Sequence, residues 1–218
     1  KIPDTRIVPQ AHHVCGEVGY APYALPGSML LGEKIADTFL KGFQVVLLEN
    51  HGVVTVGADL LQAFQRLETL DFCARTLIQA GHVGQPQPLT EEQIQLFHSR
   101  DNRLPTFTPP YHTSVERALR KKVVEIVHRA YDRHLMTSTE GTASVRVDEK
   151  SFLITPYGVD RKYMEIEDLV LVQDGCAEAG KTPSRAVRLH DLIYRQHPEI
   201  GSILTAQSPN AIIFSVTG

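Results

Sequence analysis

The sequence predicts an α/β protein built from layers of helices and strands. Helical segments with one apolar face alternate with short apolar strands along the 218 residues. A hydrophobic fraction of 42% and a net charge of −3 are typical of a globular protein with a packed core. Because the strands are mixed with helices of ordinary length, we expect an α/β or α+β layered arrangement.

The composition argues against several classes of protein. Lys and Arg number 22 against 25 Asp and Glu, so no basic excess predicts a nucleic-acid partner. The longest apolar runs, such as 45–48 and 169–172, are far shorter than the ~20 residues that span a bilayer, so we expect no membrane partner. Three widely spaced cysteines predict neither a disulfide framework nor a metal knuckle. We therefore expect a cytoplasmic protein.

The first part of the chain predicts three helices and two strands. Ser28 precedes an apolar stripe at helical spacing, as a capping residue does. The turn Asn50-His51-Gly52 separates two short apolar runs and places His51 at a strand end. The predicted helices are 29–41, 58–81 and 90–98, and the predicted strands are 44–48 and 53–56.

A proline-rich segment separates this part from a second one. Residues 99–111 hold three prolines and show no periodicity, which is typical of a linker. We therefore predict a first domain half at 1–98, a linker at 99–111 and a second domain half at 112–218. Beyond the linker, the predicted helices are 114–134, 184–196 and one from 209, and the predicted strands are 143–147, 151–154, 169–173 and 202–205.

The second part carries motifs of a known family. The segments GTASVR, FLITPYGVDRKYMEIEDLVLVQDG and TPSRAVRLHDLIYRQHPEIGSILTAQS resemble the front half of a class II aldolase domain. The first part, with an apolar strand that runs into Asn50-His51-Gly52, resembles the back half of the same domain. The chain is therefore identified as a member of the class II aldolase/adducin family, similar to L-fuculose-phosphate aldolase-type domains. The resemblance implies a three-layer fold with a central, largely antiparallel sheet flanked by helices.

The order of the two halves is inverted relative to the family. A tandem repeat cut out of phase would give this order, and so would a circular permutation of one domain. In both cases Gly218 joined to Lys1 would read as continuous sequence. Since the chain lacks an initiator Met, we expect the tandem repeat.

The resemblance implies a zinc site of three histidines and a glutamate, in which zinc acts as a Lewis acid and the glutamate as the acid/base. His51 matches the histidine of the back half, although a histidine at a turn is as often structural. Ala186 stands where the glutamate belongs, and Thr205 and Gln207 stand where the other two histidines belong. No catalytic residue is retained in this half, so we expect its zinc site to be degenerate and this chain alone to be inactive.

The phosphate-binding part of the family pattern is better preserved. Glycine, threonine and serine near helix N-termini can present N–H and hydroxyl donors to an anion. The matching residues are Gly141, Thr142, Thr155, Gly158 and Ser184. Thr142 replaces an asparagine, and Arg185 replaces a second serine. Arg185 either adds positive charge to the site or lies on the solvated surface.

The resemblance implies that the intact protein is a metal-dependent lyase of carbohydrate metabolism. We expect reversible aldol cleavage of a small sugar-phosphate substrate, with zinc as the cofactor and a homo-oligomer as the assembly. Two alternatives remain open. One is a non-catalytic, adducin-like scaffold, and the other is a small-anion binder that works without metal.

Overall fold

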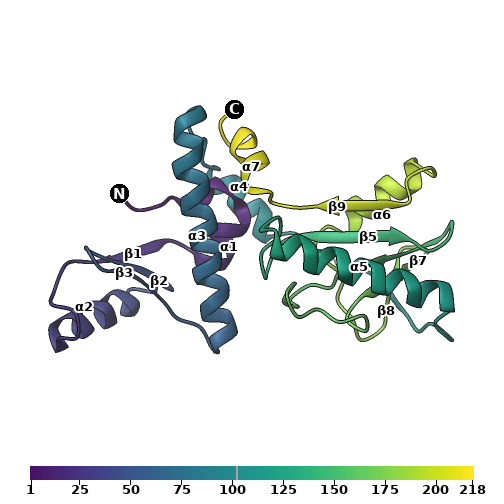
Figure 1. Ribbon diagram of the computed structural model, residues 1–218, viewed down its shortest axis with the longest axis horizontal. Helices are drawn as coiled ribbons and strands as arrows, with labels where there is room; N and C mark the ends of the chain where they lie inside the picture. Colours follow the sequence, from purple (N-terminus) through teal and green to yellow (C-terminus); the bar gives the residue numbers. More distant parts are fainter. Residues whose placement is uncertain (102) are drawn as a thin grey trace. The chain divides into compact units, whose positions relative to one another are not determined.

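The computed structural model describes residues 1–101 and 103–218, and the chain forms two compact units (Figure 1). Unit 1 comprises residues 1–100 and 209–218, and unit 2 comprises residues 101–208. Each unit has its own β-sheet with helices packed on it. The α/β class expected from the sequence is thereby confirmed.

Unit 1 contains a three-stranded sheet of order β1-β2-β3. Strands β1 (Val18–Ala21) and β2 (Val45–Leu48) are parallel, and β3 (Gly52–Thr55) is antiparallel to β2. The helices of the unit are η1 (Thr5–Ile7), α1 (Pro9–Cys15), α2 (Met29–Leu40), α3 (Leu60–Val83), α4 (Glu91–His98) and α7 (Pro209–Ser215). The periodic helices and both strands around the 50–52 turn agree with the sequence prediction, whereas α1 and β1 were not predicted.

Side-chain caps fix where the helices of unit 1 begin. The Ser28 hydroxyl accepts a hydrogen bond from the N–H of Leu31 at 3.2 Å, at the start of α2. Thr90 and Gln93 form a reciprocal capping box at the start of α4. Each cap satisfies N–H groups that have no partner within the helix, and a cap contributes about 1 kcal/mol.

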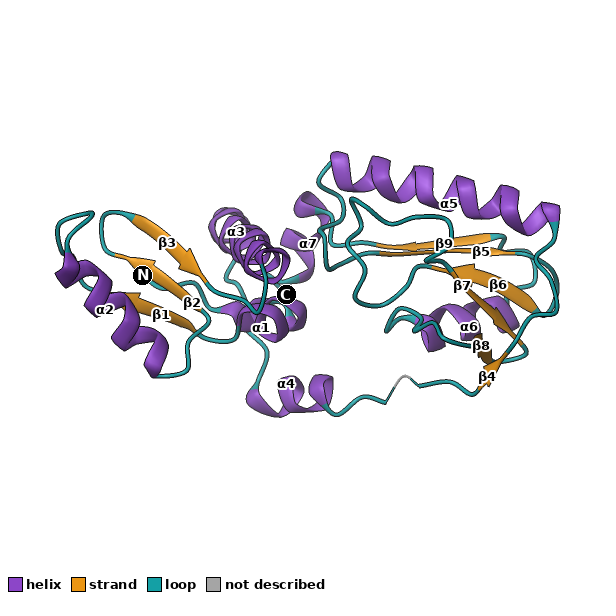
Figure 2. Ribbon diagram, turned by 90° about the horizontal axis from the view of Figure 1, so that it is seen from below, coloured by secondary structure: helices purple, strands orange, loops and turns teal. Residues whose placement is uncertain are grey.

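The helical core of unit 1 is completed by the end of the chain. Helix α7 lies beside α3 (Figure 2), and the Gln87 N–H donates to the Val216 carbonyl at 2.8 Å. One buried cluster joins residues from distant parts of the sequence: Ile7, Val8, Ala11, Phe72, Cys73, Ala80, Ile213 and Val216. Unit 1 therefore depends on residues from both ends of the sequence.

Unit 2 contains a six-stranded sheet of order β4-β8-β7-β6-β5-β9. The sheet is antiparallel except for the β4/β8 pair, and α5 and α6 cover its opposite faces (Figure 2). This three-layer arrangement with a largely antiparallel sheet agrees with the expected fold. Its elements are β4 (Thr106–Phe107), α5 (Ser114–Asp132), β5 (Thr142–Arg146), β6 (Ser151–Ile154), β7 (Val170–Gln173), β8 (Cys176–Glu178), α6 (Val187–Gln196) and β9 (Ser202–Thr205).

Strand β4 lies within the segment 99–111 that was expected to be a linker. Its two residues, Thr106 and Phe107, pair with Ala177 and Glu178 of β8. A two-residue strand is too short to produce a period in the sequence, and three prolines surround it. Residue 102 of the segment lies outside the described residues, and the division into halves at 98 and 112 stays a prediction.

A buried ion network attaches the β7–β8 hairpin to α5. Arg120, which is 5% exposed, bonds to Glu116 at 2.7 Å and to Glu178 at 3.1 Å. Its Nη1 also donates to the Leu169 carbonyl at 2.6 Å. Burial by itself would raise the pKa of the Glu178 carboxyl, but hydrogen bonds from Lys181 and a backbone N–H hold this pKa below its usual range. The carboxylates are thus paired in the folded state, and breaking one pair leaves an uncompensated buried charge.

Replacing Glu116 is therefore expected to destabilise unit 2 strongly. We predict that Glu116→Gln lowers the free energy of unfolding by about 3 kcal/mol, measured by urea denaturation at neutral pH with a probe in unit 2. The matched control is Asp191→Asn, which removes a carboxylate from the exposed Asp191–Arg195 pair and should cost less than about 1 kcal/mol. Equal effects of the two substitutions would show that the buried network does not stabilise the hairpin.

Candidate functional site

Four of the five predicted phosphate-binding residues come together where β5 begins and the chain approaches α6. The Thr142 and Ser184 hydroxyls lie 2.6 Å apart. The Ser184 N–H donates to the Thr155 carbonyl at 2.9 Å, and the Thr155 hydroxyl accepts from the Ala143 N–H at 3.3 Å. We call Gly141, Thr142, Thr155 and Ser184 the hydroxyl cradle. Gly158 follows in the same loop as Thr155, with φ of +75° and open space where a Cβ would lie.

Gly141 is required by the local geometry of the cradle. Its φ is +111°, a conformation that residues with a side chain rarely adopt. A Cβ atom at this position would lie 2.4 Å from Met136 Cγ and 2.6 Å from its Sδ. The Gly141 carbonyl accepts a hydrogen bond from Arg161 Nε at 2.9 Å. Backbone shape alone therefore explains this glycine, with or without a ligand.

A row of polar contacts, which we call the polar seam, joins β5 to α6. Ser144 Oγ lies 2.7 Å from His190 Nδ1 and 2.8 Å from the Tyr194 hydroxyl. Arg146 Nη2 donates to the Tyr194 carbonyl at 2.8 Å, and the guanidinium lies over the Tyr194 ring. Since alternate residues of a strand share a face, Ser144 and Arg146 point to the same side as Thr142. The seam thus extends from the cradle along the length of α6.

His190 is the buried centre of the seam. Its side chain is 0% exposed, and burial lowers its pKa to about 4. The second ring nitrogen, Nε2, lies 3.0 Å from the hydroxyl of Thr205. The neutral imidazole therefore links β5 to the end of β9, and its two nitrogens are both used within the protein. This is a packing role, not the exposed position that a general base needs.

The residues that the resemblance places at the family's zinc positions do not fit a zinc ion. In unit 2 these positions carry the methyl group of Ala186, the Thr205 hydroxyl and the amide of Gln207, none of which is a good zinc ligand. In unit 1, His51 is exposed in the β2–β3 turn. Its backbone N–H donates to the Leu48 carbonyl at 3.2 Å. Among the described residues, no group of three or more His, Cys, Asp or Glu side chains is arranged to hold a metal ion.

The structure pairs Arg185 with Glu140, a charged residue that the sequence patterns did not single out. Arg185 Nη2 donates to Glu140 Oε1 at 2.8 Å, and both side chains are largely buried. The Arg185 guanidinium also lies 5.3 Å from the ring centroid of Tyr157. Arg185 is thus an ion-paired residue beside the cradle and not a solvated surface group. The available sequence signal for Glu140 was its position directly before Gly141.

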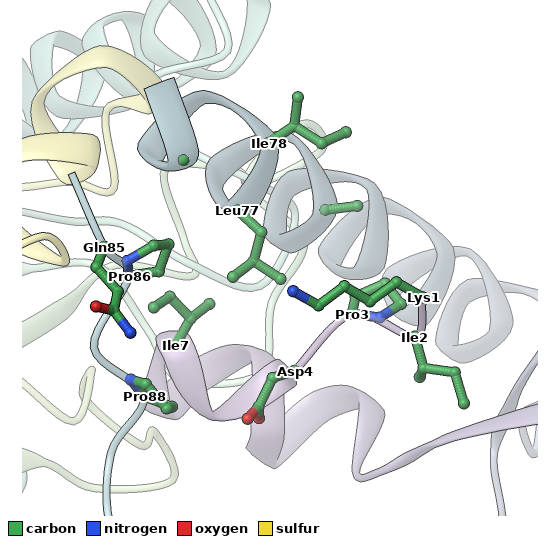
Figure 3. Close-up of a pocket in the computed structure, with 12 residues that line it drawn as sticks. Lys1, Ile2, Pro3, Asp4, Ile7, Leu77, Ile78, Gln85, Pro86 and Pro88 are labelled. Atoms are coloured by element: carbon green, nitrogen blue, oxygen red, sulfur yellow. The ribbon is translucent and has the colours of Figure 1, made fainter. Parts of the chain in front are cut away.

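A groove of about 590 Å³ lies in unit 1, between the first residues of the chain and α3 (Figure 3). Its walls are mainly apolar, from Ile2, Ile7, Leu77 and Ile78. Its carboxylate, Asp4, is bonded to Arg6 at 2.7 Å, and this partner holds the pKa of Asp4 below its usual range. The other polar side chains that line the groove are those of Lys1 and Gln85.

Comparison with known proteins shows the family of the chain. The sequence matches the family described as Class II Aldolase and Adducin N-terminal domain over residues 2–78 and 121–218. These two segments cover most of the chain and include both the cradle and the 50–52 turn. The chain belongs to the class II aldolase and adducin family.

Relatives and solved structures each match part of the chain. Methylthioribulose-1-phosphate dehydratase of Pectobacterium carotovorum is 40% identical over 80 residues, which are 36% of this chain and 39% of that protein. The enzyme of the same name from Serratia proteamaculans is 33% identical over 44% of this chain and 48% of that protein. The chain thus spans less than half of the length of these relatives. The structure of YgbL from Escherichia coli is 28% identical, with a TM-score of 0.42, over 44% of this chain and 46% of that one.

None of the helices among the described residues is long and apolar enough to cross a bilayer. The longest, α3, spans 24 residues. It carries several charged residues along its length, among them Arg66, Glu68 and Asp71.

The burial of His190 predicts a pH dependence of stability. The histidine titrates at about 4 in the folded protein and at 6.5 when unperturbed, so the unfolded chain binds more protons between these values. The stabilising contribution is fully present above pH 6.5 and decreases as the pH falls toward 4. Over this pH range the contribution of His190 to the free energy of unfolding changes by about 3 kcal/mol.

The measurement is urea unfolding of unit 2 from pH 4 to pH 7. We expect His190→Gln to lose most of this pH dependence, and the control His197→Gln, which changes a histidine with a 53% exposed side chain, to retain it. The burial argument for His190 is wrong if the two variants have the same pH profile as the unchanged protein.

Proposed function

We propose that the chain is part of a lyase of the class II aldolase family that acts on a small sugar phosphate, and that unit 2 contributes a phosphate-binding site without metal chemistry of its own. Family membership supports the reaction class. The names of the relatives point to a phosphorylated ketose as substrate and to a lyase-type reaction, a dehydration.

The hydroxyl cradle is the observation that carries the proposal for unit 2. Two hydroxyls, on Thr142 and Ser184, lie 2.6 Å apart, and each can turn its proton toward a phosphate oxygen instead of its neighbour. Arg185 adds a cation directly after Ser184. Hydroxyl donors together with a guanidinium are a suitable donor set for a phosphate monoester. In this role unit 2 binds the phosphate and orients the sugar, and it moves no proton.

The donor set limits what unit 2 can do chemically. A zinc-dependent step needs the ligands that Ala186, Thr205 and Gln207 do not supply, and a proton transfer needs the carboxylate that Ala186 lacks. Zinc in the intact protein therefore requires donors besides these residues, with His51 as the candidate from the back half. We also propose that the intact protein is a homo-oligomer, as the family resemblance implies.

The inverted order of the halves has support from the comparisons. The family match falls into two segments, and each relative aligns with less than half of this chain. A collinear alignment to a chain with exchanged halves can cover one half at a time. We propose on this basis that residues 1–98 and 112–218 are a back half and a front half, from a tandem repeat or a circular permutation.

A non-catalytic role is the second candidate, and the missing ligands favour it. An adducin-like scaffold or an anion-binding domain needs neither the glutamate nor the histidines that unit 2 lacks. Phosphate binding without lyase activity would be the expected behaviour of an anion-binding domain. A scaffold would show neither phosphate binding nor lyase activity.

Phosphate binding tests the role of the cradle. We expect Ser184→Ala to weaken the binding of inorganic phosphate by about tenfold, since a hydrogen bond to a charged group contributes about 1.5–3 kcal/mol. Chemical-shift titration of the whole chain detects weak binding and identifies the residues that respond. Ser202→Ala removes an exposed hydroxyl from β9 and is the control that should bind as the unchanged chain does. A response confined to residues outside unit 2 would contradict the proposal.

Restoring the family's ligands tests the assignment of the degenerate positions. The triple substitution Ala186→Glu, Thr205→His and Gln207→His is expected to raise zinc affinity at least about tenfold over that of the unchanged chain, because it adds three of the donors that zinc prefers. Competition with a chromophoric chelator measures this change, and Thr205→His alone is the control. If the triple variant gains no more than the single one, these three positions do not correspond to the family's metal ligands.

A further inference from the structure

An ion pair flanks the hydroxyl cradle on two of its three segments. Glu140 directly precedes Gly141, and Arg185 directly follows Ser184. The two side chains meet at 2.8 Å and are 12% and 20% exposed, respectively. A carboxylate of the protein itself therefore neutralises the cation that stands beside the cradle hydroxyls.

The surrounding charges add no net attraction for an anion. Arg161 is 3% exposed, and burial lowers its pKa to about 10, while the carboxylates of Glu140 and Asp160 act in the opposite direction. It remains a cation at neutral pH, but its Nε and Nη1 donate to the carbonyls of Gly141 and Val159. The formal charges cancel within the set Glu140, Asp160, Arg161 and Arg185.

The geometry allows Arg185 to exchange its partner without leaving the site. Its guanidinium lies over the ring of Tyr157, which is 47% exposed. A guanidinium offers several N–H donors in a planar fork and can hold an aromatic contact while it changes the oxygen to which it donates. The contact with Tyr157 therefore keeps Arg185 near Ser184 when Glu140 is displaced.

We propose that Glu140 is an internal counter-anion of the hydroxyl cradle, which holds Arg185 until a phosphate monoester displaces it. The inference rests on the proposed function, because it requires the cradle to bind phosphate. A phosphate dianion competes with the carboxylate through its second charge and its additional acceptor oxygens. A monoanion has neither advantage, so Glu140 sets both the affinity and the anion selectivity of the site.

The test is to remove the charge of Glu140 while its shape is retained. We expect Glu140→Gln to bind inorganic phosphate about tenfold more tightly than the unchanged chain, as a unit charge removed from ion-pair distance implies. We also expect the variant to bind acetate, used as a monoanionic probe, measurably better. Isothermal and chemical-shift titrations of the whole chain give the affinities and the residues involved. Asp191→Asn is the matched control, since it makes the same change of net charge at the exposed Asp191–Arg195 pair.

A second substitution separates displacement at Arg185 from a general effect of charge. In the double variant Glu140→Gln, Arg185→Gln, the gain in phosphate affinity should disappear, because the released cation is absent. Unchanged thermal unfolding of Glu140→Gln would show that the turn before β5 is intact.

The outcomes distinguish the inference from the proposed function. If the unchanged chain binds phosphate in unit 2 and Glu140→Gln binds no better than Asp191→Asn, the counter-anion role is wrong and the cradle stands. The same conclusion follows if the gain persists in the double variant. If neither the unchanged chain nor Glu140→Gln binds phosphate at the cradle, the phosphate-binding role of unit 2 fails as well.

Discussion

The polar seam between β5 and α6 is the interaction on which the arrangement of unit 2 depends. Two residues of a strand advance about 6.6 Å and four residues of a helix about 6.0 Å. Contacts of Ser144 and Arg146 can therefore keep in step with His190 and Tyr194 over the length of the helix. The seam fixes the helix on the sheet, and so it fixes where Ser184 lies relative to Thr142.

The same seam shows where reasoning from the sequence succeeds and where it stops. The apolar stripes of α2, α3 and α5 predicted those helices because a helix buries one face, and this pattern is visible in the chain itself. The alternation of Thr142, Ser144 and Arg146 with apolar residues predicts a strand, but it also suggests a solvated polar face. In the structure Ser144 and Arg146 bond to α6 and Thr142 bonds to Ser184 just before it. No local pattern can express these contacts because the partners are about 40 to 50 residues away.

The candidate site likewise has residues that the sequence could predict and residues that it could not. Gly141, Thr155 and Ser184 could be found from family motifs, since each motif is a local run of residues. The Glu140–Arg185 pair could not, because it joins residues separated by 45 positions. Three strands also escaped prediction: β4 and β8 have two and three residues, too few to establish a period, and β1 has four. Their positions are determined by the neighbouring strand, and that information is not local.

Thr205 shows how the end of β9 is attached to the core of unit 2. The hydroxyl bonds to His190, so the end of β9 is attached to the core through a neutral hydrogen bond. A buried histidine whose two nitrogens are used within the protein needs no ion for its stability. The link between the end of β9 and α6 therefore rests on a hydrogen bond between neutral groups.

The placement of α7 has a consequence for how the protein is made. Unit 2 is formed by the continuous stretch 101–208, whereas the core of unit 1 contains Ile213 and Val216 together with Ile7 and Phe72. A chain leaves the ribosome from its N-terminus, and domains fold as units when their residues are available. The core of unit 1 is therefore complete only when residues 209–218 have been synthesised, and during translation unit 2 can fold before unit 1.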